Sequence, residues 1–193
     1  MFRNRLMAVG LTFCTLAVVL APSQAQAQTK PFKLTGGGTA PDGLPIFTGS
    51  PPAPHNATGN ATHLGKYTGD EGMFTLLSID LSTLTGTFEG SFVFVAANGD
   101  RLKCNYRGNP NIPGTGTFSG SLTPDGQVVL TFIQEFVPVP AESTGKFATI
   151  TGGSFIMIAT SEPFPLEISP EGYTPPFAYT WVGNGSLTFG HGK

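Results

Sequence analysis

The sequence predicts an all-β protein in which an antiparallel meander closes into a roughly eight-stranded barrel. Three observations lead to this prediction. Short runs rich in Phe, Val, Thr and Ile are bounded by turn residues, a Gly-Thr-Phe pattern recurs, and no long segment carries a helical apolar stripe with start and stop signals. The predicted strands cover residues 73–80, 86–97, 101–106, 116–123, 127–137, 146–160 and 177–189.

The segment that precedes these strands has a different composition. Residues 28–72 are rich in Gly, Pro, Thr and Asn, and we expect them to form a strap that packs on the barrel. The Ser-Pro-Pro-Ala-Pro stretch at 50–54 favours a loop, because proline donates no hydrogen bond to a β-ladder. Residues 73–193 then form the barrel, and residues 28–193 form a single domain.

Two tight turns separate the predicted strands. Asn98 and Gly99 fit the positive φ angles of a type I′ hairpin turn. The Pro-Asp-Gly sequence at 124–126 is typical of a turn between two further strands. Both turns favour antiparallel neighbours.

The strongest internal feature is a repeat. Thr-Gly-Thr-Phe-Glu-Gly-Ser-Phe at 85–92 recurs as Thr-Gly-Thr-Phe-Ser-Gly-Ser-Leu at 115–122. Side chains alternate along a strand, so Phe88, Gly90 and Phe92 share one face. Glycine between large side chains allows a coiled sheet to bend over its own core. We therefore interpret the repeat as structural, and closure of the sheet removes its free edges.

A segment of the sequence resembles a known barrel. Thr-Gly-Lys-Phe at 144–147, followed by Gly-Gly-Ser-Phe at 152–155, is similar to a segment of the barrel shared by plant allene oxide cyclases and dirigent proteins. It also resembles exported bacterial proteins built on Gly-Thr-Phe repeats. The resemblance implies an eight-stranded antiparallel barrel whose cavity, in the plant families, holds a small apolar molecule. The resemblance does not imply that this chain has the activity of the plant enzymes.

The first 27 residues have the features of a secretion signal. A short basic start precedes an apolar run at 6–21, and Ala-Gln-Ala at 25–27 supplies a small-x-small cleavage pattern. An uncleaved anchor is the alternative, although the run is shorter than the roughly 20 apolar residues of a membrane-spanning helix. We expect an exported bacterial protein, periplasmic or extracellular, with no membrane span after removal of the signal.

Composition narrows the class of protein further. Without Arg3 and Arg5, eight Lys and Arg face twelve Asp and Glu, which gives a net charge of −4. Only 11% of the residues are charged, against roughly 25% in ordinary soluble domains. Sixteen phenylalanines argue against disorder. These values exclude a coiled coil, a collagen, a disulfide-stapled miniprotein and a basic nucleic-acid binder.

Two residues in the predicted strands are candidates for chemistry. Cys104 is the single cysteine left after signal removal, and we interpret it as a buried thiol, with an intermolecular bridge or a reactive thiol as alternatives. Glu135 shares a strand face with Thr131 and Ile133. On the barrel interior it would be a desolvated general acid or base, and on the exterior an ordinary solvated charge.

The remaining candidates would bind ions. We interpret His55 and His63, near Asp70 and Glu71, as solvated loop histidines and expect no metal site, with a role as metal ligands as the alternative. We expect no cofactor, and we expect His191 to lie in a frayed tail. A basic strand face is either a contact for an anionic partner or a solvated face that blocks edge pairing. It consists of Arg101, Lys103 and Arg107.

These observations favour a non-catalytic binding or accessory protein for a small apolar ligand. One alternative is a cyclase- or isomerase-like enzyme with Glu135 or Cys104 in a barrel pocket. Another is a self-associating structural surface protein, which would form homo-oligomers. The sequence contains neither a Gly-x-Ser-x-Gly elbow nor a phosphate-binding loop.

Overall fold

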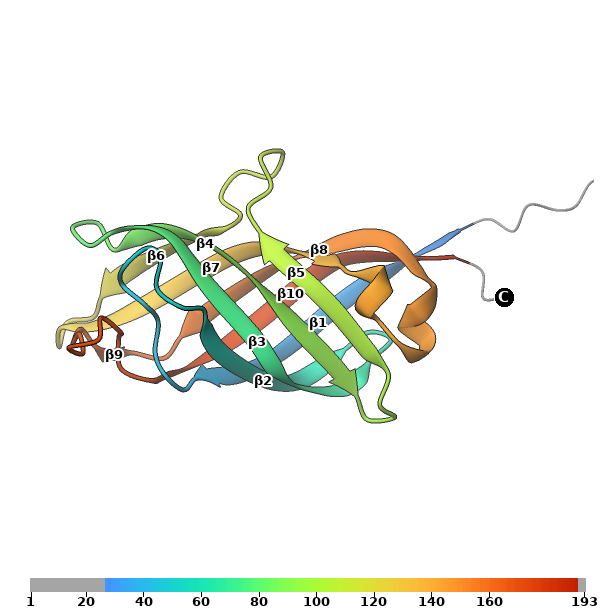
Figure 1. Cartoon of the computed structure of the whole chain (residues 1–193), viewed down its shortest axis with the longest axis horizontal. Coiled ribbons are helices and arrows are strands. Elements are labelled where there is room, and N and C mark those ends of the chain that lie inside the picture. Colours follow the sequence, from blue (N-terminus) through green and yellow to red (C-terminus); the bar gives the residue numbers. More distant parts are fainter. Residues whose placement is uncertain (1–26, 191–193) are drawn as a thin grey trace, which may run out of the picture.

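The computed structural model describes residues 27–190 as one antiparallel sheet closed into a barrel (Figure 1). Residues 1–26, which hold nearly all of the expected signal, and His191 lie outside the described residues. The closed ring confirms the all-β, eight-stranded barrel predicted from the sequence. Neighbouring strands in the following list pair with each other, and the last pairs with the first: β1 (Gln28–Ala40), β2 (Ala53–Ala61), β3 (Gly65–Asp80), β4 (Thr85–Ala96), β5 (Arg101–Arg107), β7 (Gln127–Pro138), β8 (Ile150–Ser161) and β10 (Phe177–Phe189).

Two short strands lie outside the ring. β6 (Thr117–Leu122) follows β5 in the space between β4 and β7 and pairs with both of these strands. β9 (Phe164–Pro165) pairs with the start of β7. Both strands lie at the end of the barrel where the β1–β2, β3–β4, β6–β7 and β8–β10 connections meet, on the left in Figure 1. We call this end the mouth.

Within residues 27–190, helical structure is confined to two turns between β7 and β8. The 3-10 helices are η1 (Pro140–Glu142) and η2 (Gly145–Thr149). η2 occupies the start of the strand that we expected at 146–160, so that boundary was wrong. Gly145 has a φ of 60°, which is incompatible with an extended strand. Within residues 27–190, no helix is long and apolar enough to cross a membrane.

The segment 28–72 is part of the barrel wall, and our expectation of a separate strap was wrong. β1, β2 and the start of β3 all come from it. These strands carry few large apolar residues, so the usual alternation of apolar and polar residues is faint. At Gly38, an added Cβ would lie 1.7 Å from the carbonyl oxygen of Asn56 on β2. Glycine therefore allows two backbones to approach at a distance that a side chain would prevent.

The two expected hairpin turns are present, and the first differs from the predicted type. Of its residues, Gly99 alone has a positive φ, 86°. The amide of Gly99 donates to the carbonyl of Ala96, and the amide of Ala96 donates to that of Asp100, both at 2.9 Å. This is a three-residue loop closed by a glycine bulge, and the turn at 124–126 has the same form.

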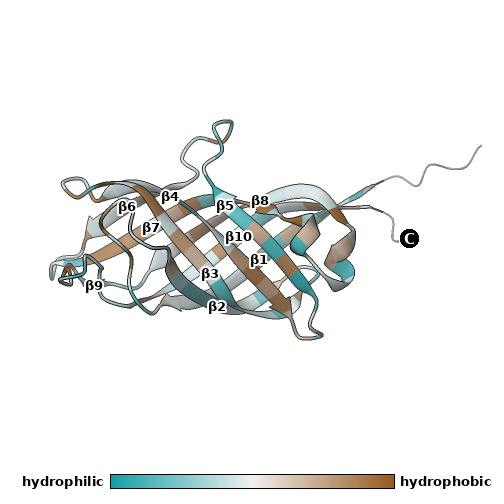
Figure 2. Ribbon diagram, viewed as in Figure 1, coloured by the Kyte–Doolittle hydropathy of each residue, from teal (hydrophilic) through white to brown (hydrophobic). Residues whose placement is uncertain are grey.

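The interior of the barrel is filled mainly by aromatic side chains. Residues alternate between interior and exterior along the strands, as the hydropathy colours along β5 show in Figure 2. Phe88, Phe92 and Phe94 are buried on the inner face of β4, as the repeat predicted. Near the chain termini, the ring of Phe155 lies 4.7 Å from that of Phe32 and 5.1 Å from that of Phe136, between centroids. This half of the barrel is tightly packed.

Glycines inside the strands make room for these rings. A Cβ at Gly90 would lie 2.4 Å from the ring of Tyr106 on the paired strand β5, and 2.0 Å from the carbonyl oxygen of Met73. The absent side chain therefore lets Tyr106 lie across β4 and reach β3. The glycine of the repeat positions an aromatic ring as well as bending the sheet.

Replacing Gly90 with alanine is expected to destabilise the barrel by about 1–3 kcal/mol, because Tyr106 and the backbone of β3 would have to move. Urea denaturation measures the change. The control is Gly152→Ala, because a Cβ at Gly152 would meet no atom within 4 Å and the residue needs no positive φ. This control is expected to change stability by less than about 0.5 kcal/mol. Equal losses in the two variants would contradict the packing role of Gly90.

Candidate functional site

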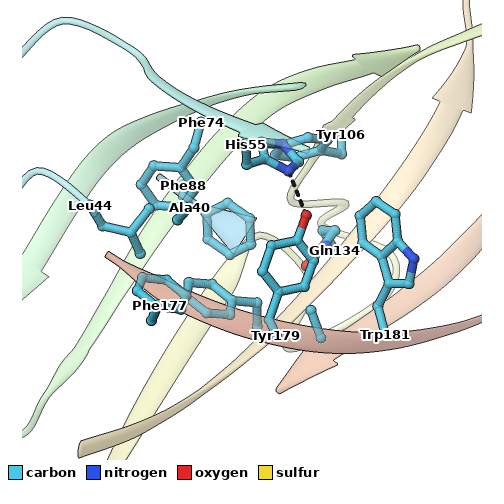
Figure 3. Close-up of a pocket in the computed structure, with 12 residues that line it drawn as sticks. Ala40, Leu44, His55, Phe74, Phe88, Tyr106, Gln134, Phe177, Tyr179 and Trp181 are labelled. Carbon is cyan, nitrogen blue, oxygen red and sulfur yellow. Dashed lines mark hydrogen bonds between the residues drawn. The ribbon is translucent and has the colours of Figure 1, made fainter. Parts of the chain in front are cut away.

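A cavity of about 50 Å³ lies in the mouth half of the barrel (Figure 3). Its wall is mostly aromatic, and His55 and Gln134 bring polar atoms into it from β2 and β7. A cavity of this size has room for no more than a few water molecules. The lining residues are Ala40, Leu44, His55, Phe74, Phe88, Tyr106, Phe132, Gln134, Ala159, Phe177, Tyr179 and Trp181.

His55 is held between two tyrosine hydroxyls. Its Nδ1 lies 2.9 Å from the hydroxyl oxygen of Tyr179, and its Nε2 lies 3.0 Å from that of Tyr106. Each tyrosine hydroxyl also lies 2.8 Å from a backbone carbonyl oxygen, that of Asn56 for Tyr179 and that of Met73 for Tyr106. The ring of His55 is therefore fixed by both nitrogens.

His55, Tyr106 and Tyr179 together have fewer hydrogen-bond donors than their four contacts require. A neutral histidine carries one N–H, and each tyrosine carries one O–H, which makes three protons for four contacts. Burial lowers the pKa of His55 to about 4, so the ring is neutral at pH 7. Burial also raises the pKa of Tyr106 and of Tyr179 well above the ordinary value. One acceptor in the group therefore lacks a proton at neutral pH.

Trp181 forms the back wall of the site. Its indole N–H donates to the hydroxyl oxygen of Tyr67 at 2.7 Å, and Tyr67 in turn donates to the carbonyl of Thr35 at 3.3 Å. The indole lies edge-on to the ring of His55, with 6.4 Å between centroids and an interplanar angle of 89°. Trp181 is the single tryptophan of the chain. Its fluorescence therefore reports directly on the cavity.

Gln134 is the polar residue of the site that sequence reasoning missed. It lies on the inner face of β7 between Phe132 and Phe136 and is 5% exposed. Its Oε1 is buried and has no hydrogen-bond partner among the described residues. The signal was present in the sequence, because a glutamine that alternates with phenylalanines in an apolar strand shares their face.

A second cavity of about 40 Å³ lies between the first cavity and the mouth. Leu44 and Phe74 line both cavities, so these two side chains form the wall between them. The second cavity is almost wholly apolar, with Thr174 as its one polar lining residue in the described chain. A molecule that displaced Leu44 would occupy a continuous space with a polar inner end and an apolar outer end.

Two loops cover the mouth above these cavities. The loop 41–52 and the loop 166–176 are joined by backbone hydrogen bonds, including Thr174 N–H to the carbonyl of Leu44 at 2.9 Å and Ile46 N–H to that of Gly172 at 2.9 Å. The backbone N–H of Leu44 also donates to the hydroxyl of Thr174, at 3.0 Å. Leu44 is therefore positioned by the contact between the loops.

The two residues proposed for catalysis lie away from the cavity. Glu135 is on the exterior face of β7, but it is covered and not solvated, because Asn109 of the β5–β6 connection donates to its carboxylate at 2.7 Å. Cys104 points inward, is fully buried, and does not line the cavity. Burial raises the pKa of its thiol, as expected for a packed cysteine.

The candidate ion sites are dispersed. His55 points into the barrel, whereas His63 lies in the β2–β3 turn with Nε2 3.2 Å from the carbonyl oxygen of Pro31. Glu71 pairs with Arg101 on the exterior. No group of three or more His, Cys, Asp or Glu residues that could hold a metal occurs in residues 27–190. The alternative of a metal site formed by His55 and His63 with Asp70 and Glu71 was therefore wrong, because β2 separates the two histidines. The interpretation of His55 as a solvated loop residue was also wrong, because it lies on β2 and lines the interior cavity.

The basic strand face lies on the outside of β5. The guanidinium of Arg101 donates a hydrogen bond to the carboxylate of Glu71, and the ammonium of Lys103 donates to the hydroxyl of Ser91 at 3.0 Å. Arg107 is exposed near the end of the strand. These contacts are typical of a solvated strand face. The face does not block edge pairing, because β5 is paired with both β4 and β7.

The chain matches no protein-family model, no curated protein and no solved structure. The resemblance to the allene oxide cyclase and dirigent barrels therefore stays a prediction.

Acid is expected to destabilise the protein through His55. The unfolded side chain takes up a proton near pH 6.5 and the folded one near pH 4, so the unfolded state binds more protons between these values. Stability is present above pH 6.5 and is lost as the pH falls towards 4, by about 2–3 kcal/mol for this residue.

Urea denaturation of the wild type and of His55→Gln between pH 7 and pH 4 tests this expectation. Carboxylates contribute their own acid dependence, so the difference between the two proteins isolates His55. The variant is expected to lose less stability than the wild type. His63→Gln, at a half-buried position in the β2–β3 turn outside the cavity, is the matched control and is expected to follow the wild type. Parallel curves for wild type and His55→Gln would contradict the assignment.

Proposed function

We propose that this chain is an exported, non-catalytic binding protein for a small molecule with an apolar body and a hydrogen-bond donor at one end. The observation that carries the proposal is the buried side chain of Gln134, which lines an aromatic cavity and whose Oε1 has no partner among the described residues. Export rests on the signal features of residues 1–27.

A buried carbonyl group without a hydrogen-bond donor lowers the stability of the folded protein. Leaving a buried acceptor without a donor costs about 1–3 kcal/mol, whereas leucine at the same position would avoid that cost. Such groups in a protein interior are normally satisfied by protein, water or ligand. A ligand donor directed at Gln134 accounts for a polar residue in the middle of a phenylalanine-rich strand.

The second cavity supplies the place for the apolar body. It continues from the first cavity towards the mouth behind Leu44 and Phe74. The volumes of the two cavities limit a fully enclosed ligand to a few heavy atoms, because a cavity that binds benzene is about 150 Å³. A longer molecule would extend through the mouth when the two covering loops separate.

The alternative of a cyclase- or isomerase-like enzyme would depend on His55 and its two tyrosines. General acid–base catalysis is most efficient when the pKa of the catalytic group lies near the working pH. Burial lowers the pKa of His55 to about 4 and raises that of both tyrosines, so these groups are a weak base and weak acids at neutral pH. Their chemistry suits the holding of a ligand better than the transfer of protons.

Titration with 1-butanol and with diethyl ether tests the proposal. The two molecules have the same composition, and 1-butanol has a donor that the ether lacks. We expect 1-butanol to change the fluorescence of Trp181 and to bind about tenfold more tightly than the ether, the value of one hydrogen bond. No saturable change with 1-butanol, or equal binding of the two, would overturn the proposal.

Gln134→Leu is expected to abolish the preference for 1-butanol over the ether while raising the free energy of unfolding by about 1 kcal/mol, because it removes a buried unsatisfied group. Fluorescence titration and urea denaturation measure the two effects. The control is Gln127→Leu at the start of the same strand, outside the cavity lining. It is expected to leave the preference unchanged. A destabilised Gln134→Leu that keeps the preference would contradict the role of this side chain.

A further inference from the structure

The amide of Gln134 is unpartnered at both of its polar atoms. The side chain is 5% exposed and lies among the aromatic residues that line the first cavity (Figure 3). Its Oε1 has no donor, and its Nε2 makes no hydrogen bond within residues 27–190. In a primary amide, one N–H lies on the same edge as the C=O. Gln134 therefore offers the cavity one donor and one acceptor side by side.

The other polar side chains of the cavity wall have partners within the protein. Both ring nitrogens of His55 lie within 3.0 Å of the hydroxyls of Tyr106 and Tyr179, which also contact backbone carbonyls. The indole N–H of Trp181 donates to a tyrosine hydroxyl outside the cavity lining. Hydrogen bonding to a ligand in this cavity is therefore left to the amide of Gln134.

The cavity disfavours a charged head group of either sign. Among the described residues, its lining contains no Asp, Glu, Lys or Arg that could pair with a charge. Burial lowers the pKa of His55 to about 4, because this environment disfavours the charged form. An ammonium or a carboxylate would likewise lose its hydration without gaining an ion-pair partner. The wall therefore favours an uncharged head group.

We infer that the head group of the ligand is an uncharged primary carboxamide that forms two hydrogen bonds with the amide of Gln134. The inference rests on the proposed function and names its ligand class. Two primary amides that face each other edge to edge form both hydrogen bonds at once. The Oε1 of Gln134 accepts from the ligand N–H, and the Nε2 of Gln134 donates to the ligand C=O.

Simpler head groups satisfy this amide less completely. An ether or a ketone offers an acceptor only and leaves Oε1 of Gln134 without a donor. A hydroxyl carries its donor and its acceptor on one oxygen atom, which cannot lie in line with both atoms of the amide. A ligand that displaces ordered water loses affinity unless it reproduces the hydrogen bonds of that water. A primary amide reproduces the bonds to both atoms.

The size of the cavity also favours a primary amide. The first cavity has a volume of about 50 Å³, and the apolar second cavity continues from it behind Leu44 and Phe74. A lactam presents the same polar edge, but it adds a ring beside the polar atoms. A primary amide ends in its NH2 group and is narrower. The apolar body of the ligand is directed towards the second cavity.

Titration of the wild-type protein with three isomeric amides tests the inference, with the fluorescence of Trp181 as the readout. Propionamide carries its N–H and C=O on one edge. N-methylacetamide adopts the trans form, which places them on opposite edges. N,N-dimethylformamide has no N–H. We expect propionamide to bind about tenfold more tightly than either isomer, because it alone forms the second hydrogen bond.

Titration with 1-butanol in parallel separates the inference from the proposed function. If 1-butanol binds and propionamide binds no more tightly than N-methylacetamide, the paired amide is overturned and the binding function stands. Absence of saturable binding by both propionamide and 1-butanol would overturn the binding function itself. We expect the two molecules to compete for one site, and binding of propionamide without competition would also overturn the inference.

Gln134→Met tests the residue that forms the pair. Methionine is similar to glutamine in length and has no amide, so we expect the variant to bind the three isomers with equal affinity. Its affinity for propionamide is expected to fall about tenfold. Urea denaturation checks that the variant is folded, and the comparison of isomers on the wild type does not depend on it.

The matched control is Gln127→Met, at the start of β7 and outside the cavity lining. It removes an amide from the same strand and is expected to retain the preference for propionamide. A folded Gln134→Met variant that also retains this preference would overturn the pairing with Gln134.

Discussion

The limited width of the barrel interior is the constraint on which the rest of the structure depends. A ring of eight strands has room for side chains and little else, and this chain fills that room with aromatic rings. Large rings fit only where a neighbouring strand lacks a side chain. Gly90 makes this space for Tyr106, and Gly36 makes it for Tyr67 and Trp181. The high glycine content therefore follows from the high aromatic content.

The candidate site is a consequence of the same packing. Tyr106 reaches Met73 and His55 because it lies across Gly90, and Trp181 is fixed by its hydrogen bond to Tyr67. The polar atoms are therefore held by residues that also form the core. A site built in this way is preorganised, and binding then requires little further ordering of side chains. Movement is left to the loops at the mouth, which carry Leu44.

The sequence predicted the closed barrel and the inward face of β4 because both depend on local alternation. It did not predict the site, because the partners of His55 are 51 and 124 residues away in the chain. His55 also lies in a strand whose small neighbours conceal the β-pattern. On β7, the charged Glu135 was the candidate predicted from the sequence, and it lies on the outer face. The adjacent Gln134 lies among the phenylalanines of the inner face. Alternation alone distinguishes these two positions.

The polar residues inside the barrel also bear on the alternative of a structural surface protein. Such a protein needs a stable interior and a suitable exterior, and nothing in that role requires a neutral histidine or an unpartnered glutamine in the core. Both residues reduce stability, Gln134 through an unsatisfied carbonyl and His55 through the cost of protonation at acid pH. Residues that reduce stability and converge on one cavity are characteristic of a binding site. The interior of this barrel therefore favours a ligand-binding role over a purely structural one.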